Sequence, residues 1–76
     1  MDYKSQNEKI LNYLRKNKKG ITSMKAFWRF RITRLSARIY DLREKGKHII
    51  TVREANIFND GYHARYVLVK DKEWWE

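Results

Sequence analysis

The sequence contains no cysteine and no proline, and only three of its 76 residues are glycine. Without cysteine, neither a disulfide framework nor a thiolate zinc site can stabilise the fold, and a reducing setting inside a cell is the simpler expectation. Proline-rich linkers, low-complexity runs and repeats are also missing. A chain of this length buries only ~60% of its unfolded surface in one core. The sequence therefore predicts a single domain over residues 1–76, with a short tail at 71–76.

Long apolar runs are absent as well. Nowhere do about 18 apolar residues follow one another, as a membrane-spanning helix requires. Residues 1–6 lack the apolar stretch of a signal peptide. We therefore expect a soluble, cytoplasmic protein with no membrane partner.

Signatures of catalysis are scarce. His48 and His63 are the only histidines, and we find no clustered carboxylates, no phosphate-cradling glycine loop and no nucleophile motif. The sequence predicts a protein that is not an enzyme and that has no metal site, no cofactor and no small-molecule substrate.

Negative charge is scarce, whereas positive charge is abundant. Eighteen Lys and Arg against nine Asp and Glu give a net charge of +9, and such an excess attracts polyanions. No acidic residue occurs between Glu8 and Asp41. A surface that serves only solubility usually mixes both signs, so the charge indicates nucleic acid as the partner. The basic residues of that segment are Lys9, Arg15, Lys16, Lys18, Lys19, Lys25, Arg29, Arg31, Arg34 and Arg38.

Two helices are predicted in the first thirty residues. Ser5 and Glu8 have the spacing of a capping box, so a first helix is expected to begin there and to end in the lysine-rich segment before Gly20. Ile21, which follows Gly20, is expected to form a short extended contact. A second helix is expected to follow it, capped within residues 22–23.

A third helix is predicted by the spacing of its apolar residues. Leu35, Ile39 and Leu42 are four and three residues apart, Thr33 is the expected cap, and Gly46 marks the end. Two helices joined by about three residues form a helix-turn-helix.

Beyond the third helix, the sequence pattern becomes that of strands. Residues 48–53 and 62–69 are rich in β-branched side chains, and residues 55–61 between them are rich in turn formers. The order of elements indicates an α+β winged helix-turn-helix, with three helices followed by a two-stranded β-hairpin as the wing.

The outer face of the third helix, about Thr33–Lys45, is the surface that would enter a DNA major groove. Arg34 is the first candidate for reading a base, because arginine binds guanine bidentately; a phosphate contact is the alternative. Arg38 lies nearer the apolar stripe, so it either covers the core or reaches a phosphate. Asp41 and Glu44 would repel phosphates, although Asp41 is spaced to pair with Lys45. Only the first half of the helix is therefore expected to enter the groove.

The predicted DNA contacts come from three elements. Cations of the second helix suit phosphates, because this helix commonly crosses the backbone. Polar hairpin residues suit a minor groove or flanking phosphates, and ordinary loop polarity is the alternative. The predicted residues are Lys25, Arg29, Arg31, Thr33, Arg34, Ser36, Ala37, Arg38, Tyr40, Arg53, Asn56, Asn59, His63 and Arg65.

The aromatic residues of the helices and strands are expected mainly in the core. Phe27, Phe30 and Tyr66 have core-compatible spacing, so packing is their predicted role rather than base stacking. Trp28 is harder to bury on the same helix, and it marks either a second contact surface or a ring lying across the hairpin.

The segment from residue 30 to residue 46 resembles the helix-turn-helix core of a family of small winged helix proteins of bacteriophages and prophages. Residues 34–39 are the most specific part, and the resemblance extends over about residues 7–50. It implies a phage or prophage DNA-binding protein in the cytoplasm of a bacterial host, with Thr33 and Arg34 beginning the recognition helix. Relatives often have glycine at the position of Arg31.

Two functions follow from these observations. The first is binding of double-stranded DNA by a transcriptional regulator or by an accessory factor in recombination or replication, acting as a homodimer or with a cooperating protein because one helix reads a short site. The second is inhibition of a host protein through Trp28, Trp74 and Trp75. Docking of the two tail tryptophans on their own domain is the structural alternative.

Overall fold

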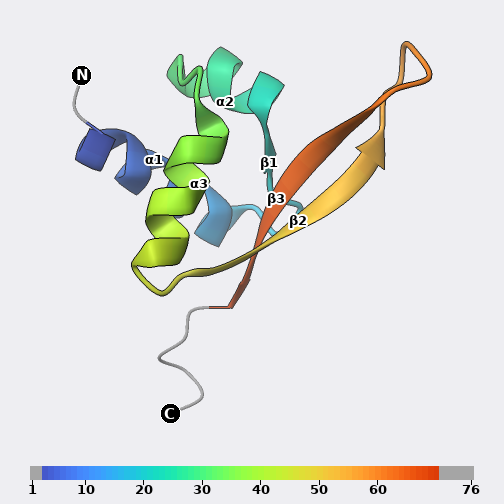
Figure 1. Cartoon of the computed structure of the whole chain (residues 1–76). Helices are drawn as coiled ribbons and strands as arrows, with labels where there is room; N and C mark the ends of the chain where they lie inside the picture. The colour runs from blue at the N-terminus through green and yellow to red at the C-terminus, as the bar shows by residue number, and fades with distance from the viewer. Residues whose placement is uncertain (1–2, 71–76) are drawn as a thin grey trace.

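The computed structural model describes residues 3–70, in which three helices pack against an antiparallel sheet of three strands (Figure 1). The predicted winged helix plan with three helices is confirmed. The predicted two-stranded sheet is wrong, because a short strand between the first two helices joins it. The elements are α1 (Tyr3–Lys16), β1 (Ile21–Thr22), α2 (Ser23–Phe30), α3 (Leu35–Glu44), β2 (His48–Ala55) and β3 (Tyr62–Lys70).

The additional strand is β1, which pairs with β3 through Ile21 opposite Tyr66 and Thr22 opposite Arg65. The strand order is therefore β1-β3-β2, with β3 in the middle. A strand of two residues has no periodicity of its own, and its identity comes from the partner strand. The short extended contact expected at Ile21 is confirmed, and its partner is now identified.

Helix starts agree with the sequence at α2 and differ at α1. The Thr22 hydroxyl accepts a hydrogen bond from the Lys25 backbone N–H at 3.2 Å, which confirms a cap at residue 22. In contrast, α1 begins at Tyr3, so Ser5 lies within the helix and does not begin it.

The start of α3 also differs from the expectation. The helix begins at Leu35, and Arg34 occupies the N-cap position with φ −121° and ψ 63° and no side-chain cap. Thr33 lies one residue too early to cap the helix. The side chains of residues 33 and 34 are both exposed at this end of α3.

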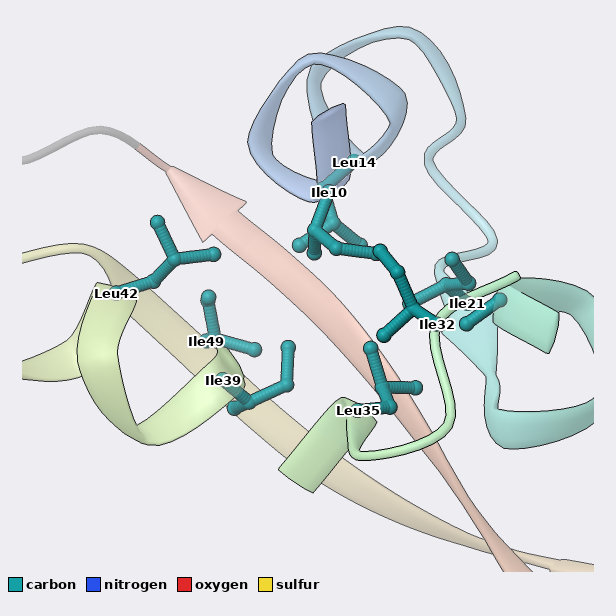
Figure 2. Close-up of a cluster of buried hydrophobic side chains, with 9 residues drawn as sticks. Ile10, Leu14, Ile21, Ile32, Leu35, Ile39, Leu42 and Ile49 are labelled. Atoms are coloured by element: carbon teal, nitrogen blue, oxygen red, sulfur yellow. The ribbon is translucent and has the colours of Figure 1, made fainter. Parts of the chain in front are cut away.

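The core is aliphatic and draws on every helix and on two strands (Figure 2). Ile10 and Leu14 of α1 point toward the turn residue Ile32, while Leu42 of α3 faces Ile49 of β2. Burial of such side chains supplies most of the driving force for folding. The buried hydrophobic residues are Ile10, Leu14, Ile21, Ala26, Ile32, Leu35, Ile39, Leu42 and Ile49.

Two of the three aromatic residues expected in the core pack at its edge. Phe30 and Tyr66 are half-buried against the cluster, and the Phe30 ring meets Tyr13 edge-on at 5.9 Å. The expectation for Phe27 is wrong, because its side chain is 43% exposed. The single face that the short helix α2 buries is centred on Ala26, and Phe27 lies about 100° around the axis from it.

Candidate nucleic-acid interface

The first half of α3 presents a polar outer surface. Ser36 and Tyr40 lie one turn apart, both exposed, with exposed Thr33 and Arg34 just before the helix and half-buried Ala37 beside them. The buried residues of α3 occupy the other side of the helix. The structure thus brings together, on one exposed surface, the residues for which the apolar spacing predicted DNA recognition.

Arg38 lies on the inner side of α3. Its side chain is 8% exposed, and its guanidinium lies 3.3 Å from the Asp41 carboxylate and 3.4 Å from the Gln6 amide oxygen. The Asn7 amide also donates to Asp41 at 3.4 Å. Asp41 therefore pairs with Arg38 rather than with Lys45. Together these groups join α1 to α3, and this position corresponds to the core-covering alternative for Arg38.

The turn between α2 and α3 depends on a left-handed residue. Arg31 has φ 59° and ψ 28°, and its backbone N–H donates to the Phe27 carbonyl at 2.8 Å. Glycine is the usual residue in such a helix-ending conformation. Here the Arg31 guanidinium lies 5.7 Å from the centre of the Phe27 ring, so the side chain stays exposed and charged.

The two cations of α2 point to different places. Lys25, in the first turn, is exposed and lines the surface pocket described below. Arg29, in the last turn, places its guanidinium 5.9 Å from the Tyr13 ring and 5.8 Å from the Phe30 ring. Arg29 therefore lies along the junction of α1 and α2.

One face of the hairpin adjoins α3. Because side chains alternate along a strand, the buried Ile49 shares its face of β2 with Thr51 and Arg53. Arg43 of α3 donates to the Ile49 carbonyl at 2.9 Å and to the Thr51 hydroxyl at 3.0 Å, which fixes α3 on this side. Arg53 continues the same face, with its guanidinium 4.1 Å from the centre of the Tyr62 ring. We call this the helix-side face of the hairpin.

The opposite face of the hairpin carries an internally paired arginine. Val52 faces Arg65 across the ladder, so Arg65 points away from the helix-side face. Its guanidinium contacts the Glu54 carboxylate at 2.6 Å and the Lys19 carbonyl at 3.3 Å. His63 Nε2 lies 2.8 Å from Glu54 as well. Hydrogen bonds from Arg65 and then from His63 hold the pKa of Glu54 below its usual value of 4.5.

Polar side chains organise the wing loop from within. The Asn59 side-chain oxygen accepts from the Asn56 amide and from the Gly61 backbone N–H, both at 2.8 Å. The Asn56 side-chain oxygen contacts His63 Nδ1. Asn56, Asn59 and His63 thus bind one another, whereas sequence reasoning offered them to DNA.

A family model described as a winged helix-turn-helix domain matches residues 5–71. The chain belongs to this family. A winged helix-turn-helix domain suggests DNA as the binding partner. No curated protein and no solved structure matches the chain.

The winged helix domain also has a basic pocket that sequence reasoning did not single out. The pocket measures about 500 Å³ and lies where α1 ends and α2 begins. Its described lining contains five cations and no carboxylate, although one of the cations, Arg65, is bonded to Glu54. The lining residues are Tyr13, Lys16, Asn17, Lys18, Lys19, Gly20, Thr22, Lys25 and Arg65.

Within residues 3–70, no three His, Asp or Glu side chains come together as metal ligands. The helices in the same range are too short or too polar to cross a membrane. Trp74 and Trp75 lie outside the described residues.

Proposed function

We propose that this winged helix domain binds double-stranded DNA, with α3 in the major groove and the hairpin wing beside it. One observation carries the proposal. Exposed Arg34 at the start of α3 and exposed Arg53 of β2 are nineteen positions apart in sequence, yet both belong to the α3 side of the sheet. The Glu54 carboxylate lies on the other face of the hairpin, where it would not oppose phosphates.

Each exposed group has a role in this arrangement. Arg34 donates to a guanine or to a phosphate at the groove edge, and Ser36 and Tyr40 provide hydroxyls on the same surface. Half-buried Ala37 leaves room for a thymine methyl. The exposed cations Arg31 and Lys25 neutralise phosphates of the DNA backbone.

The biological role that we propose rests on the resemblance to phage and prophage proteins. The domain would act in the cytoplasm of a bacterial host as a transcriptional regulator or as an accessory factor in recombination or replication. Because a single recognition helix covers a short site, useful specificity calls for a homodimer or a cooperating protein. Light scattering of the protein with DNA tests this requirement.

Fluorescence anisotropy with a random-sequence duplex over a salt series tests the DNA proposal. Five to eight phosphate contacts give a slope of log affinity against log salt of about −4 to −7. Loss of a bidentate contact in Arg34→Ala weakens binding about tenfold or more. Lys9→Ala is the matched control, because Lys9 is an exposed cation of α1 that is not among the predicted DNA contacts. Absence of binding by the wild type at low salt would refute the proposal.

A second function has one observation in its favour. Trp28 and Met24 of α2 are 68% and 71% exposed and line a shallow pocket of about 220 Å³. Exposed tryptophan is typical of protein contact sites. The domain would then bind and inhibit a host protein, and Trp28→Ala would abolish that complex without changing DNA affinity.

A further inference from the structure

The end of the wing carries the two most exposed large hydrophobic side chains of the described residues. Ile57 is 88% exposed and Phe58 is 93% exposed. They are adjacent in the loop between β2 and β3, which projects away from the helices at the far end of the hairpin (Figure 1). Two such side chains in water are unfavourable unless a partner covers them.

The loop itself keeps these side chains outside. Besides the side-chain bonds of Asn59, the Asn56 backbone N–H donates to the Gly61 carbonyl at 3.0 Å, which closes the loop at its base. The interior of the loop is therefore filled by polar groups that bind one another. The side chains of Ile57 and Phe58 therefore lie outside the loop, in solvent.

The length of the hairpin matches the distance between neighbouring DNA grooves. Arg43 fixes β2 to α3 at Thr51, and Ala55 ends the strand four residues later. At about 3.3 Å per residue this stretch measures about 13 Å, and Phe58, seven residues beyond Thr51, lies at most about 23 Å from it. Half a helical turn of DNA is about 17 Å, which separates a major groove from the adjacent minor groove.

We propose that Ile57 and Phe58 form an apolar wedge that enters the minor groove beside the site of α3, partly unstacks a base step and kinks the duplex. This inference rests on the proposed DNA binding and adds a deformation of the DNA to it. Architectural DNA-binding proteins insert phenylalanine and isoleucine in this way. Arg53, on the helix-side face behind the wedge, neutralises the phosphates that the kink brings closer.

One residue of the loop, Asp60, carries a negative charge that repels DNA phosphates. Asp60 is exposed in the same loop and has no basic residue among its immediate sequence neighbours. Its carboxylate raises the free energy of approach to phosphates. Asp60→Asn is therefore expected to increase DNA affinity about twofold to threefold, and unchanged affinity would contradict placement of the loop at the groove.

The experiment compares DNA bending by the full chain and by a double variant, Ile57→Ser with Phe58→Ser. A duplex of about 25 base pairs with a donor and an acceptor dye at its ends reports bending by energy transfer, and 2-aminopurine in the strand reports unstacking. We expect a kink of about 20–90° with the wild type. The double variant loses the kink and about tenfold in affinity, and its salt slope becomes shallower by no more than about one, because only the phosphate contact that the kink brings to Arg53 is lost.

The controls separate the possible failures. Met24→Ser removes another exposed apolar side chain, from α2, and should bend DNA like the wild type. Circular dichroism verifies that the double variant folds. Wild-type binding without a kink or without a 2-aminopurine signal overturns the wedge but leaves the proposed function standing. Absence of all DNA binding overturns both. A double variant that still bends DNA but no longer self-associates in light scattering identifies the tip as a protein contact and overturns the wedge.

Discussion

The two faces of the hairpin each carry an arginine, yet these two side chains are in opposite electrostatic situations. Arg53 lies over the neutral ring of Tyr62 on the helix-side face, so its positive charge remains available. Arg65 points the other way and is bonded to the Glu54 carboxylate, which cancels much of its charge. A net charge of +9 therefore does not mark a binding surface by itself. The neighbour of each cation decides whether it can serve a polyanion.

The largest expected effect separates these two arginines by DNA affinity. Arg53→Glu reverses a charge beside the proposed groove and is expected to lower affinity about tenfold or more. Arg65→Ala removes a charge that is already compensated and should change affinity by less than about threefold. Anisotropy titrations at one salt concentration measure both. Equal losses in the two variants would mean that both faces of the hairpin contact DNA.

The second expected effect is a difference in thermal stability between variants of Arg65 and of Arg53. Arg65→Ala leaves Glu54 with one partner fewer and breaks the link to Lys19, so we expect the melting temperature to fall by a few degrees. Arg53→Ala removes only a contact with an exposed ring and should leave the melting temperature nearly unchanged. Thermal unfolding followed by circular dichroism measures the difference, and the reverse order would contradict the assignment.

The third effect is a dependence of stability on pH that comes from Glu54. Its pKa is lower in the folded protein than the usual 4.5, so the ionised form of Glu54 stabilises the fold. This contribution is complete above the unfolded pKa and decreases as the pH falls from about 4.5 through the folded pKa. Glu54→Gln should remove this part of the acid sensitivity. Urea unfolding between pH 3 and 7 tests it, and equal slopes for both proteins would refute it.

The smallest effect concerns a third arginine, at the turn. Arg31 also lies over a ring, but it does so in a left-handed backbone conformation that costs L-residues about 1 kcal/mol. Arg31→Gly relieves this strain but gives the unfolded chain more conformational freedom, so the free energy of unfolding should rise by no more than about 0.5 kcal/mol, while the loss of one cation lowers DNA affinity about threefold. Opposite signs in the two measurements are the expected signature. A loss of both would show that the contact with Phe27 outweighs the strain.

Local patterns in the sequence predicted the number and order of the helices and the buried face of α3, but not where α1 and α3 begin. The spacing of Leu35, Ile39 and Leu42 places all three on the buried side of α3, and the same geometry exposes Ser36 and Tyr40. These relations depend only on neighbours within two turns. Their success reflects the fact that a helix face is fixed by the chain itself.

The parts that the sequence did not predict depend on long-range pairing. The strand β1 exists because Ile21 meets Tyr66, and the opposite roles of Arg53 and Arg65 follow from the register of β2 and β3. The sequence predicted no role for the wedge residues Ile57 and Phe58, because they lie within a segment rich in turn formers. Their significance depends on exposure, which is a property of the folded loop.

The short length of β1 has a mechanical consequence for the wing. Beyond the pair of Thr22 and Arg65 the sheet narrows from three strands to two. A two-stranded ribbon twists more readily than a wider sheet, because fewer hydrogen bonds and fewer packed side chains resist the motion. The outer part of the hairpin can therefore twist relative to the rest of the domain, whereas α3 is packed into the core. In the proposed complex, such a ribbon would follow a duplex that is slightly overwound or underwound without displacing α3.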